Sequence, residues 1–266
     1  MILTKKQIKS FNELGYLKFK YPDIKKLLKL KKEMAALVEL SLKKNLNKYY
    51  RSICNSKNKT NILLNEGMIK LEKQNHRNLA QIYNQIRRSI SYYNVVSDNK
   101  IIFLVNKLLL KKENSNLFIN CNTIKMDIPG INKFMYGWHA DKKSNIEDSN
   151  FVQLWMPAVD DVSNKIGGLH VLEKSFKYDI QTTWTREQRL RRKKQLASRA
   201  PLSIKLLSHK NKFKAKHLTC KFGEGILFNP GLMHKSGINK TKNKMRYALV
   251  CFYHDILNPK WKFQVI

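Results

Sequence analysis

Acidic residues are scarce in this chain of 266 residues, where 19 Asp and Glu stand against 52 Lys and Arg and leave a net charge of +33 at pH 7. A small soluble domain usually carries a net charge of about 2 to 8, so the excess predicts an anionic partner. Only ten of the cations are Arg, and the 42 Lys are spread along the whole chain. Genome composition alone can produce such a bias, so the net charge by itself does not establish a nucleic-acid partner.

Cysteine is scarce too, and no two cysteines stand in a Cys-x-x-Cys pair. The four are Cys54, Cys121, Cys220 and Cys251. This spacing excludes a disulfide framework and a cysteine-rich zinc site. The sequence predicts four free thiols, mostly in the core.

Long hydrophobic runs are absent. The longest, Ile101 to Leu110, is interrupted by Asn106 and Lys107 and is far shorter than the about 20 residues that span a bilayer. The N-terminal Met-Ile-Leu-Thr-Lys-Lys lacks the apolar core and cleavage site of a signal peptide. We therefore expect no transmembrane segment and a cytoplasmic location.

No Gly/Ser-rich or Pro-rich linker and no internal repeat divides the chain. A chain of this length can bury one large core. The sequence thus predicts one domain over residues 1–266.

The first 115 residues have the pattern of helices. Thr4 to Gln7 form a capping box before a short helix that ends near Gly15. Pro22-Asp23 opens a longer amphipathic helix, and apolar residues recur at helical spacing in Leu79–Tyr93 and in Ile101–Leu110. Residues 1–115 are therefore expected to form a mainly helical buttress.

From residue 116 the pattern becomes that of short strands bounded by Gly, Pro, Asn and Asp. The expected strands are Leu117–Ile128, Phe151–Val159, Gly168–Leu172, Gly225–Asn229 and Met245–His254. Helices followed by strands predict an α+β fold in which the helices buttress a core, over 116–255, that is an antiparallel sandwich or a jelly roll (double-stranded β-helix). A basic insertion, 178–216, interrupts it.

Two histidines and one carboxylate form a candidate metal site. In His139-Ala-Asp141, both polar side chains of an extended segment point to one face. Such a triplet also arises by chance, as a loop histidine beside a solvated aspartate. His234 follows a later strand through Pro230-Gly231 and supplies a third ligand. Two histidines and one carboxylate leave three open positions, as non-heme Fe(II) needs, whereas structural zinc is usually closed by four ligands.

Arg246, twelve residues beyond His234, begins the last apolar strand. A guanidinium aimed inward from a strand is costly to bury unless it meets a carboxylate. The alternative is a strand end at the surface of a cation-rich protein.

In this order, the motifs resemble the phytanoyl-CoA dioxygenase-like branch of the Fe(II)- and 2-oxoglutarate-dependent oxygenases, over roughly Leu3 to Asp255. The segments that carry the resemblance are Leu3-Thr4 to Gly15-Tyr16, Met126 to Gly130, Trp138 to Asp141, Phe151 to Pro157 with Asp160-Asp161, Gly167 to Val171, and Gly223 to Arg246.

The resemblance implies that His139, Asp141 and His234 bind iron and that Arg246 holds the distal carboxylate of 2-oxoglutarate. Ser236 and Trp155 fall at positions that help line the co-substrate pocket. The sequence departs from the family pattern at Ala140, which is often Gln, in Glu173-Lys-Ser-Phe176, which replaces a Pro-Gly-Ser-His turn, and in one extra residue within Lys240–Lys244.

The resemblance also implies a reaction type. Halogenating relatives have Ala or Gly at the position of Asp141, so the retained carboxylate favours hydroxylation. We expect a dioxygenase that uses Fe(II), 2-oxoglutarate and O2, and that releases succinate and CO2. The basic run Arg186 to Lys194 favours a small anionic substrate, phosphorylated or linked to CoA or a nucleotide.

Two other readings stay open. A nucleic-acid-directed oxygenase would share the iron ligands, although its expected arginine-rich tail after the second iron histidine is missing. A non-catalytic scaffold of the same fold could dock on an anionic membrane or nucleic acid, and its binding would depend on salt.

Overall fold

A computed structural model describes residues 3–109, 117–131, 137–141, 151–178 and 213–255. The first of these ranges contains eight α-helices, one π-helical turn and a single strand, β1 (Tyr16–Lys20). The helices are α1 (Lys5–Leu14), α2 (Ile24–Asn45), α3 (Asn47–Ile53), α4 (Lys59–Ile62), the π-helical turn η1 (Leu63–Gly67), α5 (Met68–Gln74), α6 (His76–Ile86), α7 (Ile90–Val96) and α8 (Asn99–Leu108).

The later ranges contain strands and one short 3-10 helix, η3 (Ser175–Lys177). The strands are β2 (Leu117–Asp127), β3 (Phe151–Pro157), β4 (Leu169–Leu172), β5 (Ala215–Leu218), β6 (Glu224–Phe228), β7 (His234–Ser236) and β8 (Arg246–Asp255). They form a five-stranded sheet in the order β1-β6-β3-β8-β2 and a three-stranded sheet in the order β5-β4-β7. Every pairing is antiparallel.

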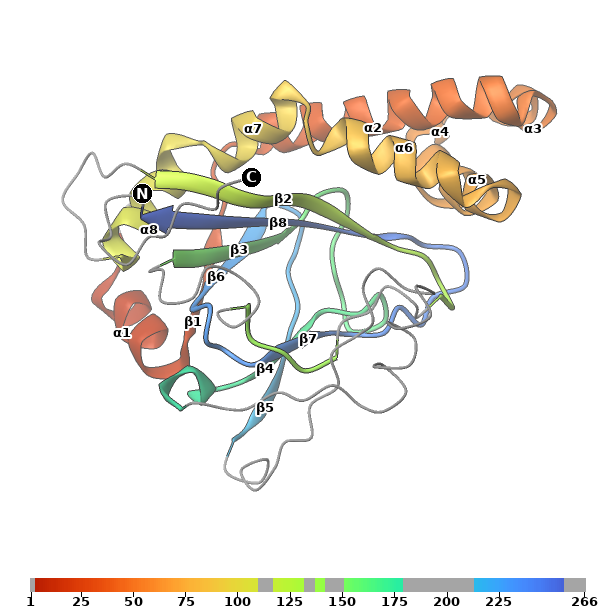
Figure 1. Cartoon of the computed structure of the whole chain (residues 1–266). Coiled ribbons are helices and arrows are strands. Elements are labelled where there is room, and N and C mark those ends of the chain that lie inside the picture. Colours follow the sequence, from red (N-terminus) through yellow and green to blue (C-terminus); the bar gives the residue numbers. More distant parts are fainter. Residues whose placement is uncertain (1–2, 110–116, 132–136, 142–150, 179–212, 256–266) are drawn as a thin grey trace, which may run out of the picture.

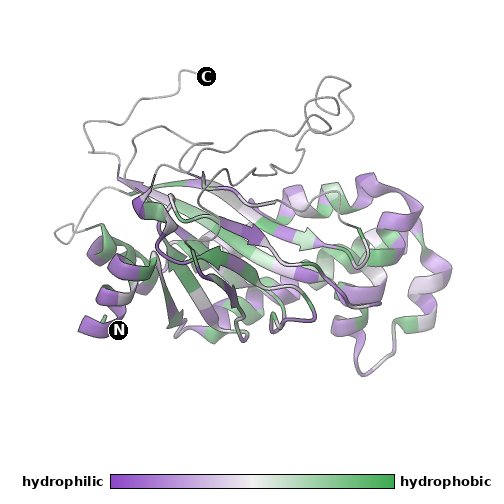
Figure 2. Cartoon of the chain, turned by 90° about the horizontal axis from the view of Figure 1, so that it is seen from below, coloured by the Kyte–Doolittle hydropathy of each residue, from purple (hydrophilic) through white to green (hydrophobic). Residues whose placement is uncertain are grey.

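The helices α2, α6 and α7 cover one face of the five-stranded sheet, and the three-stranded sheet lies on the opposite side (Figure 1). Helix α2 begins at its cap Asp23 and buries one stripe of side chains against this layer. The stripe consists of Leu27, Leu30, Met34, Ala35, Val38 and Leu42. Figure 2 shows hydrophobic residues along the strands and both hydrophobic and hydrophilic residues along the helices. The predicted helical buttress and two-sheet core are both present.

Strand β8 lies inside the molecule, and all ten of its residues are buried. Alternate side chains serve different layers, because successive residues of a strand point to opposite faces. Tyr247 and Leu249 pack with the helices, whereas Ala248 and Val250 pack between the two sheets. Burial on both faces explains why this strand reads as a continuous apolar run rather than an alternating one.

Several elements differ from the sequence expectation. The helix expected over Leu79–Tyr93 is two helices, α6 and α7, because Ser89 caps a new helix by accepting a hydrogen bond from the Tyr92 N–H. The chain between α2 and α6 holds three further helices that the apolar spacing did not reveal. Strand β5 begins inside the expected basic insertion, of which residues 179–212 lie outside the described residues.

Three of the four cysteines lie in the described part of the chain with their side chains, and all three are free thiols as expected. Cys220 and Cys251 are buried and Cys54 is half-buried. Within the described residues no helix has both the length and the apolar character needed to cross a bilayer.

Buried tyrosine hydroxyls fasten the helical layer to β8. The Tyr253 hydroxyl donates to the Val96 carbonyl at 2.7 Å, and the Tyr92 hydroxyl donates to the Val250 carbonyl at 2.9 Å. Both side chains are fully buried. These bonds tie α7 to β8 from both directions.

We therefore predict that Tyr253→Phe lowers the free energy of unfolding by about 1 to 2 kcal/mol, because the buried Val96 carbonyl loses its donor. Urea unfolding followed by circular dichroism measures the change. Tyr178→Phe is the control, since Tyr178 is 59% exposed and should change stability little. Equal stability of Tyr253→Phe and wild type would contradict the anchoring role.

Candidate metal centre

The backbones of His139 and His234 form an isolated antiparallel bridge between two distant segments of the chain. The His139 N–H donates to the His234 carbonyl and the His234 N–H donates to the His139 carbonyl, both at 2.9 Å. His234 is the first residue of β7, which is held in place by its pairing with β4. The bridge brings the two imidazoles together, with ring centroids 4.2 Å apart.

Each imidazole is oriented by a backbone carbonyl two residues earlier in the chain. The His139 Nδ1 lies 2.7 Å from the Gly137 carbonyl oxygen, and the His234 Nδ1 lies 3.0 Å from that of Leu232. A carbonyl can only accept, so these contacts assign the proton to Nδ1 and leave each Nε2 lone pair available to a metal. Both rings are buried.

Asp141 places its carboxylate between the two Nε2 atoms. Its Oδ1 lies 3.7 Å from the His139 Nε2, and its Oδ2 lies 3.4 Å from the His234 Nε2. The three residues offer ligand atoms that all lie within 4.8 Å of one another. Ligand atoms bound at right angles with bonds of about 2.1 Å are about 3 Å apart. The donor set and spacing therefore fit a single metal ion.

The electrostatics of the three side chains also suit a cation. Burial lowers the pKa of His139, and burial followed by the neighbouring His139 lowers the pKa of His234 to about 3. Burial opposes ionisation of Asp141, but the two histidines and Lys125 together bring its pKa below the ordinary value. Two neutral imidazoles and one carboxylate are the protonation states that metal binding requires.

Gln153 on β3 also lies beside these three residues, although the sequence did not predict it as a site residue. Its side chain is buried and hydrogen-bonds to Asp141. Among the described residues its Oε1 has no hydrogen-bond partner. A buried acceptor without a donor is costly, so this oxygen is suited to a ligand that donates a hydrogen bond. A lone amide in the apolar strand Phe151–Pro157 is the only sequence signal that pointed to it.

Arg246 is buried and pairs with a carboxylate, as expected for a guanidinium that points inward from a strand. Its Nε donates to Asp127 Oδ2 at 2.8 Å, and its Nη2 lies 2.7 Å from the same oxygen in an ion pair. Its Nη1 donates to the carbonyls of Gly237, at 2.9 Å, and Gly167. Asp127 was part of the quoted Met126–Gly130 motif but was not recognised as the partner.

The two remaining predicted site residues lie on the inner faces of the sheets. Ser236 is two residues beyond His234 on β7, so its side chain points to the same face. Trp155 has the same relation to Gln153 on β3 and packs in the core between the sheets. The structure thus brings His139, Asp141 and His234 together, and Arg246, Ser236 and Trp155 lie on the strands β8, β7 and β3.

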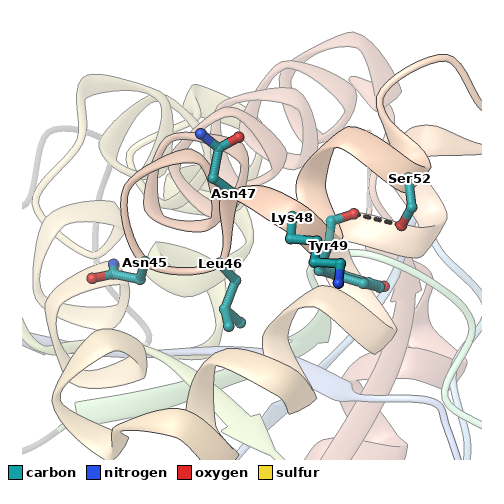
Figure 3. A pocket seen from close by; sticks show the side chains of 6 residues that line it. All are labelled: Asn45, Leu46, Asn47, Lys48, Tyr49 and Ser52. Atoms are coloured by element: carbon teal, nitrogen blue, oxygen red, sulfur yellow. Dashed lines mark hydrogen bonds between the residues drawn. The ribbon is translucent and has the colours of Figure 1, made fainter.

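Two surface cavities contain none of these residues. One, of about 610 Å³, lies at the turn between α2 and α3 (Figure 3), where the Ser52 hydroxyl donates to the Tyr49 carbonyl; it is lined by Asn45, Leu46, Asn47, Lys48, Tyr49 and Ser52. The other, of about 760 Å³, lies between α2 and the β7–β8 connection. Neither cavity contains convergent metal ligands, so the candidate site is the interior between the sheets.

A core of two antiparallel sheets around a buried cluster of two histidines and one carboxylate is the arrangement of non-heme iron oxygenases. Residues 41–248 match the model of the family described as phytanoyl-CoA dioxygenase (PhyH). The chain therefore belongs to the phytanoyl-CoA dioxygenase family, whose members are Fe(II)- and 2-oxoglutarate-dependent oxygenases. The predicted family, enzyme class and cofactors are confirmed.

Solved structures support the fold. EctD from S. alaskensis with bound Fe has a TM-score of 0.57 and 15% identity, over 96% of this chain and 78% of that one. The epimerase SnoN in complex with Fe3+, alpha ketoglutarate and nogalamycin RO has a TM-score of 0.56 and 10% identity, over 94% and 83%. EvdO2 from Micromonospora carbonacea var. aurantiaca complexed with 2-oxoglutarate has 0.51 and 12%, over 96% and 92%. No curated protein sequence matches. The predicted fold class is confirmed.

We predict that the protein binds one Fe(II) or Mn(II) per chain and that His234→Ala, His139→Ala or Asp141→Ala each weakens binding by more than about 100-fold. Loss of an outer partner of a metal ligand already costs 10- to 100-fold, and a ligand should cost more. Metal titration under anaerobic conditions measures the affinity. His76→Ala is the control, because His76 is exposed on α6; equal loss in that variant would contradict a site at the triad.

Proposed function

We propose that the protein is a 2-oxoglutarate-dependent hydroxylase that acts on a small anionic substrate and releases succinate and CO2. The observation that supports this most is the convergence of His139 Nε2, His234 Nε2 and the Asp141 carboxylate in a buried site. Three protein ligands leave three positions on an octahedral ion for a bidentate co-substrate and O2. The presence of a carboxylate at residue 141 favours hydroxylation over halogenation.

In this proposal each side chain has a distinct task. His139, Asp141 and His234 hold the iron, and Arg246 binds the distal carboxylate of 2-oxoglutarate. Ser236 and Trp155 line the co-substrate pocket. When bound, iron and 2-oxoglutarate supply the oxidising chemistry with O2, and the protein supplies orientation and a dry interior.

The surrounding contacts keep the donors ready for this task. The carbonyls of Gly137 and Leu232 fix the histidine tautomers, and Gln153 orients the Asp141 carboxylate. Phe228 stands edge-on to the His234 ring, with centroids 5.0 Å apart, and helps to exclude water from that side. Donors fixed before binding lose little freedom when the ion arrives.

The substrate class is supported by charge and by the neighbouring structures. The net charge of +33 favours an anion, and SnoN and EvdO2 were crystallised with small organic molecules. The 760 Å³ surface cavity is lined by more lysines, among them Lys165, Lys240, Lys242 and Lys244, than carboxylates, which are Asp160 and Asp161. A small anionic molecule is the substrate that these features favour.

The first test is the formation of succinate from 2-oxoglutarate. Protein purified without oxygen and given Fe(II), 2-oxoglutarate and then O2 should form succinate slowly even without substrate. His139→Ala should abolish this turnover, and Arg246→Ala should raise the KM for 2-oxoglutarate. Circular dichroism of each variant controls for folding. If wild type neither turns over nor binds Fe(II) or 2-oxoglutarate, the proposal is wrong and a non-catalytic scaffold takes its place.

A second test concerns the basic run Arg186 to Lys194, which lies outside the described residues. Neutralising Arg191, Arg192, Lys193 and Lys194 together should raise the KM for an anionic substrate more than it lowers kcat, because lost ground-state attraction appears mainly in KM. Steady-state kinetics on a substrate that wild type converts measure both constants. An unchanged KM would remove this run from substrate binding.

A further inference from the structure

The inner face of β2 carries two opposite charges near the candidate metal centre. Beyond the register shift that separates Asn120 from Thr123, Asp127 stands opposite Arg246 and Lys125 stands opposite Ala248. Residues opposite each other in an antiparallel pair share a face, and both Arg246 and Ala248 point between the sheets. Lys125 and Asp127 therefore point inward, whereas Met126 packs toward the helices.

Asp127 changes what Arg246 can offer to an anion. A guanidinium has five N–H donors. Asp127 accepts from Nε and forms an ion pair with Nη2, and two backbone carbonyls accept from Nη1. Only Nη2 still has N–H groups that donate no hydrogen bond, and the Arg246 charge is already balanced by the Asp127 carboxylate. A second carboxylate that approaches Arg246 also meets the negative charge of Asp127.

Lys125 restores the missing positive charge. It lies two residues from Asp127 on the same face of β2, opposite Ala248, so its side chain enters the space between the sheets that Asp127 and Arg246 line. Lys125 and Arg246 together carry +2, and Asp127 and Asp141 together carry −2. With a divalent ion the group has a net charge of +2, which equals the charge of a dicarboxylate dianion with the sign reversed. Without Lys125 the net charge of the same group is +1, which does not balance the dianion.

We propose that Lys125 is a positioning residue that compensates Asp127, so that the space between the sheets accepts dianionic 2-oxoglutarate although Arg246 is already ion-paired. This inference rests on the proposed function. It assigns Lys125 and Asp127 as a coupled pair, whose effects on co-substrate affinity oppose each other. A lysine with only a structural role would show no such coupling.

A double-mutant cycle tests the pair. The measured quantity is the Kd of 2-oxoglutarate for protein loaded with Mn(II), by isothermal titration calorimetry. We expect Lys125→Met to raise the Kd at least about tenfold, because an uncompensated Asp127 then repels the co-substrate. Asp127→Asn should leave the Kd equal or lower. The double variant should return to within about threefold of wild type.

Three controls separate charge from structure. Lys125→Arg keeps the charge and should keep the wild-type Kd. Lys216→Met removes an exposed strand lysine from β5 and should also leave it unchanged. The Mn(II) affinity of every variant shows whether the metal candidate itself is intact, and thermal unfolding shows whether the fold is.

The outcomes distinguish this inference from the proposed function. If wild type binds 2-oxoglutarate but Lys125→Met leaves the Kd unchanged, or the two substitutions have additive effects, the role of Lys125 is wrong and the proposed function stands. If Mn(II)-loaded wild type binds no 2-oxoglutarate, both are wrong. Rescue of Lys125→Met by Asp127→Asn supports the coupled pair.

Discussion

Two backbone hydrogen bonds between His139 and His234 fix the positions of both imidazoles, and the arrangement of the metal candidate depends on them. The bonds exist because β7 pairs with β4 and so presents His234 to the segment that follows β2. Once the bridge has formed, Asp141 needs only two further residues of chain to place its carboxylate between the rings. The fold thus brings the His139-Ala-Asp141 triplet and the distant His234 into one cluster.

The interior between the sheets tolerates polar groups because nearly all of them are paired. A buried charge is costly unless a partner and further hydrogen bonds compensate it. Arg246 meets Asp127 and two carbonyls, and each histidine donates to a carbonyl. The two Nε2 atoms of the triad face the Asp141 carboxylate, and the Oε1 of Gln153 has no partner among the described residues. A metal ion with bound water or ligand would satisfy them together.

The sequence predicted those features that leave a local pattern. Helical spacing identified α2, and a β-branched and aromatic run identified β8, because each buries a continuous set of side chains. The His-x-Asp triplet identified two of the three clustered residues. Strand β7 could not be predicted, since its three residues are polar and extended only because β4 pairs with them.

The partners of the site were equally hidden, for a different reason. The strand register puts Asp127 opposite Arg246, with Lys125 two residues away on the same face. Strand pairing likewise brings Gln153 to Asp141. Register is a property of pairing between distant segments, and no single strand contains it. A resemblance to a family could supply the ligand positions but not the charges that are particular to this chain.

The most direct test of this account is anomalous diffraction at the iron edge from crystals grown with Fe(II) without oxygen. The account predicts one iron position per chain, with bonds of about 2.0 to 2.2 Å to His139 Nε2, His234 Nε2 and an Asp141 oxygen, and with no fourth protein ligand. Iron bound elsewhere, or closed in by a fourth side chain, would contradict it.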